Sequence, residues 1–256
     1  MMSEMLSVKD LFPEGQIRFI AGPCAVESDQ QIDTTAKFLS QSGVRILRGG
    51  AFKPRTSPES FQGLGEEGLK LIRRAADRNN MLVVTEVMDE ENLELVGEYT
   101  DIFQIGSRNC QNFSLLRKVG KSEKPVLIKR GFGNTVEEFF QASRYISMGG
   151  NEQIIMVERG IRTFEDSTRF TLDVSAIPVL KEKVKYPIVV DPSHPAGKRE
   201  YVPSLSYAAV GAGADGLMIE VHPEPEKALS DARQQIDFNT FAEIYRKALN
   251  IREAMN

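Results

Sequence analysis

The sequence has few of the residues on which many functional sites depend. Its 256 residues include two cysteines, Cys24 and Cys110, two histidines, His194 and His222, and no tryptophan. Two cysteines cannot form the disulfide framework of a small secreted domain, and free thiols are typical of a reducing compartment. We therefore expect a cytoplasmic protein in which any catalytic or metal-binding histidine is one of these two.

Long apolar runs and an excess of one charge are also missing. No stretch approaches the roughly 18 apolar residues of a membrane span. The first ten residues, MMSEMLSVKD, contain acids and no apolar run, so we expect no secretory signal. The 32 Lys and Arg against 36 Asp and Glu give a net charge of −4, which argues against general nucleic-acid binding. We expect neither nucleic acid nor a membrane as a partner.

Eight short apolar runs of four to six residues recur along the chain, each bounded by turn residues. They are rich in Ile, Val and Leu, and their hydrophobicity is continuous rather than alternating. This pattern is typical of parallel strands that are buried on both faces. The runs are Ile17–Gly22, Val44–Arg48, Leu82–Glu86, Ile102–Gly106, Val126–Lys129, Ile154–Val157, Ile188–Asp191 and Gly216–Glu220.

Segments with helical periodicity lie between these runs. The clearest are Asp29–Ser42, Phe61–Asn79, Thr135–Met148 and Ser204–Gly211. Strands alternating with helices form βαβ units, and eight units in about 250 residues predict a (β/α)₈ TIM barrel of the α/β class. An open, doubly wound sheet is the alternative. No linker interrupts the pattern, so we expect a short extension over residues 1–16 and one catalytic barrel domain over residues 17–256.

In such barrels the chemistry takes place at the carboxyl ends of the strands. Six cations lie at or just after the ends of the predicted strands of this mildly acidic chain, and they predict an anionic ligand, because Arg and Lys side chains suit phosphate and carboxylate. No Walker loop or Gly-x-Gly-x-x-Gly motif follows a strand, which disfavours a nucleotide. The cations are Arg48, Lys53, Arg55, Arg108, Lys129 and Arg159.

A second group at the strand ends combines a thiol, an imidazole and carboxylates, which together can hold a divalent transition metal such as Mn, Fe, Co or Zn. His222 fits a role behind the ligands or in packing, and Cys110 fits packing. Glu86 is either a structural acid that faces the core or a group that holds a water. The candidate ligands are Cys24, His194, Glu220 and Asp231.

The segments that carry these residues form longer motifs, spread over nearly the whole chain. They are Gly22–Ser28 (GPCAVES), Arg48–Pro58 (RGGAFKPRTSP), Ile105–Asn109 (IGSRN), Glu158–Phe164 (ERGIRTF), Asp191–Arg199 (DPSHPAGKR) and Met218–Pro223 (MIEVHP). In this order they closely resemble the 3-deoxy-D-arabino-heptulosonate 7-phosphate (DAHP) synthases, in their short type I beta branch without a regulatory domain. The resemblance implies condensation of phosphoenolpyruvate with erythrose 4-phosphate, the first step of the shikimate route to aromatic amino acids.

The resemblance also implies roles for individual residues. It makes Cys24, His194, Glu220 and Asp231 metal ligands and places Glu86 near the reacting carbon. It assigns phosphoenolpyruvate binding to Arg48, Lys53, Arg108, Lys129 and Arg159. It assigns the clamp on erythrose phosphate to Lys53, Pro54, Arg55 and Thr56. Catalytic roles are expected for Cys24, Lys53, Glu86 and His194.

Three other functions remain as alternatives. One is 3-deoxy-D-manno-octulosonate 8-phosphate synthase, which uses the same barrel on arabinose 5-phosphate, although Pro54 and Thr56 favour the four-carbon sugar. Another is a Schiff-base aldolase that uses Lys129. The third is a barrel that binds a phosphorylated metabolite without catalysis.

We expect a homo-oligomer, either a dimer or a tetramer. Longer relatives carry an added domain that binds aromatic end products, and residues 1–16 are too few for such a domain. We therefore expect no feedback inhibition of this chain by phenylalanine, tyrosine, tryptophan or chorismate.

Overall fold

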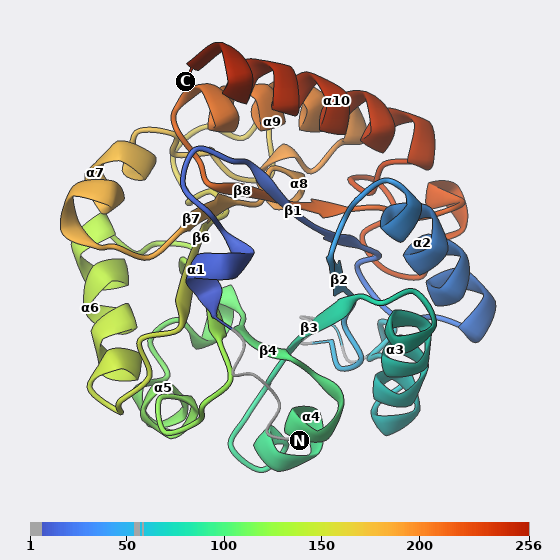
Figure 1. The fold of residues 1–256 in the computed structure, drawn as a ribbon, viewed down its shortest axis with the longest axis horizontal. Helices are drawn as coiled ribbons and strands as arrows, with labels where there is room; N and C mark the ends of the chain where they lie inside the picture. The colour runs from blue at the N-terminus through green and yellow to red at the C-terminus, as the bar shows by residue number, and fades with distance from the viewer. Residues whose placement is uncertain (1–6, 54–56, 58, 256) are drawn as a thin grey trace.

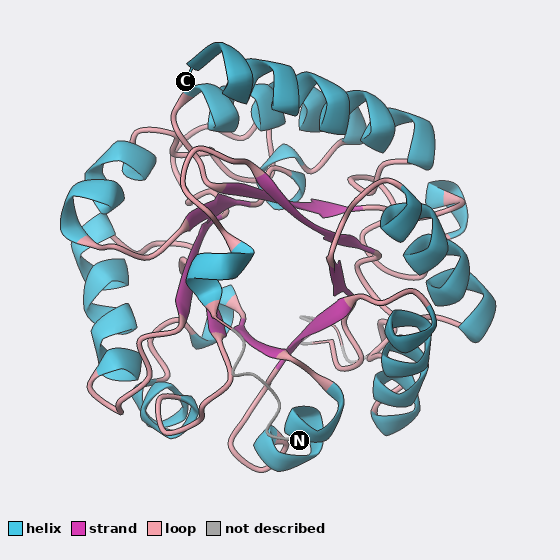
Figure 2. Ribbon diagram, in the orientation of Figure 1, coloured by secondary structure: helices cyan, strands magenta, loops and turns pink. Residues whose placement is uncertain are grey.

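The predicted barrel is confirmed by the computed structural model, which describes residues 7–53, 57 and 59–255. The described residues include eight parallel strands that pair in sequence order, and the first and last strands pair to close the ring (Figures 1 and 2). The strands are β1 Arg18–Gly22, β2 Ile46–Arg48, β3 Leu82–Glu86, β4 Ile102–Ile105, β5 Val126–Lys129, β6 Ile154–Glu158, β7 Ile188–Val190 and β8 Gly216–Glu220.

Helices surround the ring and cover the outer face of every strand (Figure 2). The outer helices are α2 Asp29–Gln41, α3 Glu66–Arg78, α4 Leu93–Tyr99, α5 Phe113–Val119, α6 Val136–Ser147, α7 Ala176–Lys183, α9 Val202–Gly211 and α10 Phe238–Met255. A short helix, α8 Ser193–Ala196, follows β7 on the side where the strands end. This is the expected arrangement of βα units around one barrel.

Most predicted boundaries lie within two residues of the observed ones. Thr135 caps α6 through a capping box with Glu138, which explains the sharp start of this helix. The segment predicted to be helical from Phe61 instead begins its helix at Glu66. Gly63 and Gly65 have φ values of +92° and +59°, which a right-handed helix does not allow, so the helix cannot begin before Glu66.

Alternation along each strand divides the apolar side chains between two cores. Ile20, Val84 and Val189 point into the barrel and form its interior core with the equivalent residues of the other strands. Phe19 and Val83, one position away, point outward and pack beneath the helices in the larger core. The same alternation decides which polar residues enter the barrel where each strand ends.

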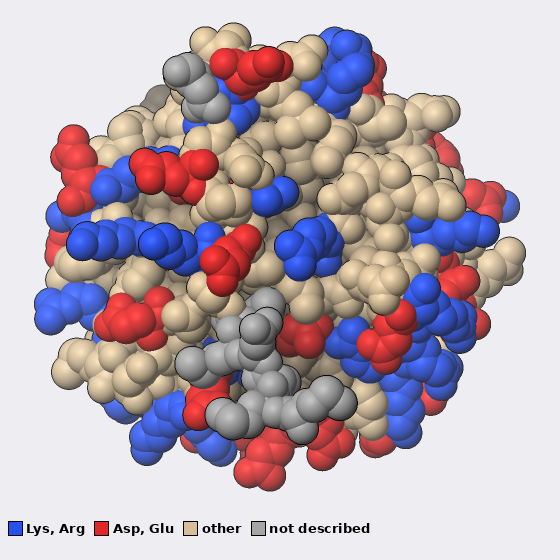
Figure 3. Space-filling model, viewed as in Figure 1, with Lys and Arg blue, Asp and Glu red and all other residues tan. Residues whose placement is uncertain are grey.

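The amino-terminal end of the barrel is closed by the segment before β1. Helix α1, Val8–Leu11, lies over the centre of the ring, and Val8, Leu11 and Phe12 pack against the interior core (Figure 1). The predicted extension over residues 1–16 therefore includes a helix that belongs to the barrel core. On this face, Lys and Arg side chains are interspersed with Asp and Glu, with no broad patch of one sign (Figure 3).

Candidate active site

The carboxyl ends of the strands surround a polar cavity of about 300 Å³. Strand alternation places there the residues two positions after the inward-facing apolar ones. Arg48 follows Ile46, and Lys129 follows Leu127, on the same strand face. The predicted site residues that line the cavity are Arg48, Lys53, Glu86, Arg108, Lys129, Arg159, His194 and Asp231.

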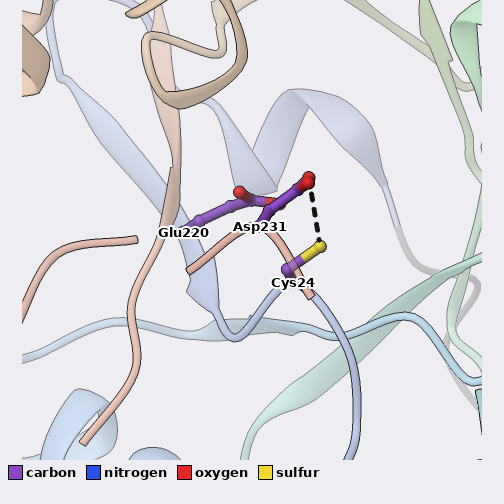
Figure 4. A group of neighbouring side chains, drawn as sticks. All are labelled: Cys24, Glu220 and Asp231. Atoms are coloured by element: carbon purple, nitrogen blue, oxygen red, sulfur yellow. Dashed lines mark hydrogen bonds between the residues drawn. The ribbon is translucent and has the colours of Figure 1, made fainter. Parts of the chain in front are cut away.

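Three of the four predicted metal ligands form a compact group beside this cavity (Figure 4). Cys24 Sγ and carboxylate oxygens of Glu220 and Asp231 all lie within 4.8 Å of one another. The fourth, His194, faces the group, with its Nε2 at 3.7 Å from Glu220 Oε1 and 3.9 Å from Asp231 Oδ2. The fold thus brings together residues that are up to about 207 positions apart in the sequence.

The pKa values of these groups reflect burial and the charges packed around them. Burial, followed by the nearby Glu220 carboxylate, raises the pKa of the Cys24 thiol to about 12. Burial acts to raise the pKa of Asp231 as well, but His194 and Arg169 outweigh it and lower that pKa to about 2. A divalent cation among these ligands would reverse the effect on Cys24, because it favours the thiolate.

The loop that carries Asp231 is held in an unusual conformation. Asp231 has a φ of +50°, a strained value for a residue other than glycine. The buried amide of Gln234 donates from Nε2 to Glu220 Oε2 at 2.7 Å and to Asp231 Oδ2 at 3.3 Å. The next residue, Gln235, accepts a hydrogen bond from the Cys24 backbone N–H at 3.0 Å. These buried amides fix the carboxylates of Glu220 and Asp231 beside Cys24, and a set of thiol, imidazole and carboxylate donors of this kind suits Mn, Fe, Co or Zn.

Two of the predicted cations line the cavity and also contact members of the metal group, as we call the candidate ligands Cys24, Glu220, Asp231 and His194. Lys53 donates from Nζ to the Cys24 carbonyl and to Cys24 Sγ, both at 3.0 Å. Arg48 donates from Nη1 to the Pro23 carbonyl at 2.7 Å and to Glu220 Oε1 at 3.1 Å. Both cations therefore lie between the candidate metal ligands and the space for a substrate.

A buried aspartate links Lys129 to His194. Asp191 Oδ2 lies 2.6 Å from Lys129 Nζ and 2.6 Å from His194 Nδ1. Burial acts to raise the pKa of Asp191, but His194 and Lys129 outweigh it and hold that pKa well below its usual range. Asp191 was not among the predicted site residues, although its place two residues after inward-facing Val189 was a usable signal.

The arginines form the other side of the cavity. Arg159 is only 2% exposed, and burial lowers the pKa of its guanidinium to about 10. Arg108 lies beside it in the cavity wall, together with Arg169, which the sequence analysis did not single out. Arg169 comes from the loop after β6 rather than from a strand end, so neither strand periodicity nor the quoted motifs pointed to it.

Glu86 faces the cavity from the end of β3. Gln104 donates from Nε2 to Glu86 Oε2 at 3.3 Å, and a Cβ atom at Gly106 would lie 2.0 Å from Glu86 Oε1. The glycine of the IGSRN motif is therefore needed for the carboxylate to occupy this place. Two roles were predicted for Glu86, a structural acid facing the core and a group that holds a water. Its position in the cavity wall agrees with the second role.

The remaining predicted residues are placed as follows. His222 is buried with its Nε2 at 3.4 Å from Glu27 Oε2, and it lies outside the group that contains Cys24. Cys110 is packed within the larger apolar core. Pro54, Arg55 and Thr56, the predicted clamp, lie outside the described residues.

Comparisons with known proteins agree with this geometry. Residues 13–256 match the sequence profile of the DAHP synthetase I family. The chain belongs to this family. It is 55% identical over 241 residues to phospho-2-dehydro-3-deoxyheptonate aldolase of Thermotoga maritima, covering 94% of this chain and 71% of that protein. The crystal structure of that DAHP synthase superposes with a TM-score of 0.92 over the same shares of the two chains.

More distant relatives carry the name of another enzyme. The 2-dehydro-3-deoxyphosphooctonate aldolase of Koribacter versatilis is 31% identical over 276 aligned positions, covering 99% of this chain and 98% of that protein. The lower identity favours the DAHP synthases as the nearer relatives. Among the described residues of this family member, no helix has both the length and the apolarity needed to cross a membrane.

Proposed function

We propose that this protein is a DAHP synthase, which condenses phosphoenolpyruvate, erythrose 4-phosphate and water to DAHP and inorganic phosphate. The observation that carries this proposal is the cationic cavity that adjoins a thiol, imidazole and carboxylate group in a member of the DAHP synthetase I family. The 55% identity to the Thermotoga enzyme supports the same substrates. The reaction is the first step of aromatic amino acid biosynthesis by the shikimate pathway.

Phosphoenolpyruvate carries a phosphate and a carboxylate, and the cavity offers cations for both. Arg108, Lys129 and Arg159 line its wall, and Arg48 and Lys53 line the side next to the metal group. Guanidiniums bind such anions through paired hydrogen bonds, which fix the orientation of the ligand as well as its position. We assign phosphoenolpyruvate binding to these five residues and the erythrose phosphate clamp to the segment from Lys53 to Thr56.

The metal site fits the family's requirement for a divalent ion. Cys24, Glu220 and Asp231, with His194 facing them, would hold the ion at the edge of the cavity. A metal bound there supplies Lewis-acid polarisation of the aldehyde oxygen of the sugar phosphate. The donor set does not distinguish Mn, Fe, Co and Zn, so the physiological metal is left to experiment.

The protein's own residues would act mainly by positioning and electrostatics. C3 of phosphoenolpyruvate attacks the aldehyde carbon, a water adds at C2, and the resulting hemiketal phosphate loses inorganic phosphate. The cations hold the phosphate and carboxylate so that C3 faces the aldehyde. We expect Lys53, which contacts Cys24, and Glu86, which also lines the cavity, to hold or move the proton of the attacking water.

The alternative functions make different demands on the same site. A Schiff-base lysine is normally activated by an apolar or cationic environment, whereas Lys129 is paired with a carboxylate at 2.6 Å. The octulosonate reaction with arabinose 5-phosphate remains the second candidate, because relatives at about 31% identity carry that name.

The deciding experiment measures phosphate release from phosphoenolpyruvate with erythrose 4-phosphate or arabinose 5-phosphate, with and without a chelator. We expect turnover with erythrose 4-phosphate, loss of activity after chelation, and recovery on addition of Mn²⁺, Co²⁺ or Zn²⁺. Faster turnover with arabinose 5-phosphate would favour the octulosonate reaction. Trapping by borohydride would instead indicate a Schiff base.

We also propose a cytoplasmic location and a homo-oligomeric assembly. Two buried free cysteines and phosphorylated metabolites as substrates agree with the cytoplasm. Light scattering coupled to size-exclusion chromatography would test for a dimer or a tetramer, and a 28.6 kDa species would contradict the assembly.

A further inference from the structure

Two phenylalanines lie among the arginines of the active site. The rings of Phe132 and Phe170 are stacked, with centroids 5.3 Å apart and planes at 10°. Phe132 comes from the loop after β5 and lines the active-site cavity, and Phe170 is buried in the loop after β6. Four guanidiniums lie over these two rings, namely Arg108, Arg159, Arg162 and Arg169.

The contacts are shared rather than one to one. Arg159 lies 4.0 Å from the centroid of Phe170 and 5.0 Å from that of Phe132. The guanidinium carbons of Arg108 and Arg162 lie 5.5 Å and 5.4 Å from the centroid of Phe132. That of Arg169 lies 5.8 Å from the centroid of Phe170. All these distances fall within the range in which a ring's quadrupole attracts a cation.

The contacts with the rings offset the electrostatic cost of placing several guanidiniums in one anion-binding site. Guanidiniums crowded in a partly desolvated wall repel one another, and a buried Arg159 loses hydration. Carboxylates would stabilise them but would also repel phosphoenolpyruvate and compete with it. Among the described residues, neither Arg108 nor Arg159 forms an ion pair with a carboxylate, whereas Arg169 lies 3.6 Å from Asp231.

We propose that Phe132 and Phe170 are positioning residues whose ring faces hold the Arg108 and Arg159 guanidiniums charged and oriented for phosphoenolpyruvate. The rings supply attraction without net charge, so these two guanidiniums keep their positive charge available to the substrate. This inference rests on the proposed function, because it takes phosphoenolpyruvate as the anion that the arginines receive.

The backbone keeps both rings in place independently of any ligand. The Arg162 N–H donates to the Phe132 carbonyl at 2.7 Å, which ties the loop after β6 to the loop after β5. Ile161 pairs with Thr171 in an antiparallel bridge next to Phe170. Gly160, with a φ of +84°, allows this approach, since a Cβ atom there would lie 3.0 Å from Phe170 Cβ. The rings are therefore part of a fixed wall.

The sharpest test changes the ring's electrostatics and leaves its size nearly constant. Phe132 is replaced site-specifically by phenylalanines with one, two and three ring fluorines, which progressively weaken the negative ring face. We expect the Kd of phosphoenolpyruvate, measured by calorimetry, to rise stepwise to about 10-fold, which corresponds to a moderate cation–π contribution. The KM of erythrose 4-phosphate should stay within about 2-fold, because its clamp is assigned to a different segment, from Lys53 to Thr56.

Conventional variants complete the test. Phe132→Leu should raise the Kd and KM of phosphoenolpyruvate, and Phe132→Tyr, which keeps a ring, should restore most of the affinity. Phe140→Leu is the matched control, because Phe140 has a comparable cation contact, with Lys183 at 5.5 Å, on the outer helices. It should leave phosphoenolpyruvate binding unchanged.

The outcomes separate this inference from the proposed function. A wild-type protein that binds no phosphoenolpyruvate would contradict the function itself. If the wild type binds it and the fluorinated series does so equally well, the rings only pack and the inference is wrong. Weaker binding by Phe132→Leu combined with an unchanged fluorinated series would overturn it in the same way. Circular dichroism and thermal unfolding of each variant show that the barrel is intact.

Discussion

One carboxylate oxygen, Asp191 Oδ2, contacts both Lys129 Nζ and His194 Nδ1 at 2.6 Å. Lys129 belongs to the proposed phosphoenolpyruvate site, and His194 faces the candidate metal ligands. The backbone N–H of His194 also donates to Asp191 Oδ1 at 3.1 Å. Asp191 therefore lies against the imidazole nitrogen that does not face the candidate metal ligands, the place that outer-shell carboxylates occupy in many metal sites.

Replacing Asp191 should accordingly weaken both halves of the site. We expect Asp191→Asn to lower metal affinity about 10–100-fold, because the imidazole loses the partner that fixes its orientation. At saturating metal, the kcat/KM of the variant should remain below that of the wild type, because Lys129 loses its buried counter-charge. Metal affinity is measured by competition with a chromophoric chelator. Asp77→Asn, on the outer surface of α3, is the control, and equal metal affinity in both variants would contradict the role of Asp191.

Much of this site could be predicted from the sequence because strand alternation and strand ends are local signals. Arg48, Lys129 and Arg159 follow inward-facing apolar residues at a spacing of two, and the fold places them in one cavity. Asp191 and Gln104 obey the same rule and could have been found by applying it to every strand. Closure of the barrel is enough to bring these strand-end residues together.

Other parts of the site depend on contacts that no local pattern encodes. Arg169 and Phe170 lie in a long loop after β6, and their positions depend on a bridge between Ile161 and Thr171. The buried amides of Gln234 and Gln235 act through hydrogen bonds to Glu220 and to the Cys24 backbone, which are distant in the sequence. Such roles follow from tertiary packing, so they needed the structure.

Loss of the thiol should remove the metal without unfolding the barrel. We expect Cys24→Ala to lower metal affinity more than the about 10–100-fold typical of losing an outer-shell partner, since a methyl group cannot replace a ligand. Metal content after dialysis, and the rise in Tm on adding metal, report this directly. Cys110→Ala, which removes a thiol from the apolar core, should keep its metal. Normal activity of Cys24→Ala at limiting metal would exclude Cys24 as a ligand.

The cations of the cavity should matter more for catalysis than for folding. Lys129→Ala and Arg159→Ala each remove a charge that we assign to phosphoenolpyruvate, and we expect kcat/KM to fall about 100-fold or more. Steady-state kinetics with each substrate varied in turn measure this, and Lys118→Ala, on the surface, is the control. Losses below about 3-fold in both cavity variants would mean that the substrate binds elsewhere.

Cys110 should be unreactive in the folded protein for a reason that pH can reveal. Burial raises the pKa of its thiol to about 11, so in the folded state the thiol keeps the proton that it must lose before it can attack a reagent as a thiolate. In a Cys24→Ala background, where Cys110 is the remaining thiol, we expect reaction with a disulfide reagent near pH 8 to be at least about 100-fold slower than in denaturant. The rate should rise with pH up to about 11 rather than level off near 9.0, the ordinary pKa of a cysteine thiol. Because the folded-state pKa is the higher one, the thiol's contribution to stability is present below the unfolded value and is lost as the pH rises through 11. A fast reaction at pH 8, at a protein concentration and temperature where circular dichroism shows the native fold, would show that the core around Cys110 opens.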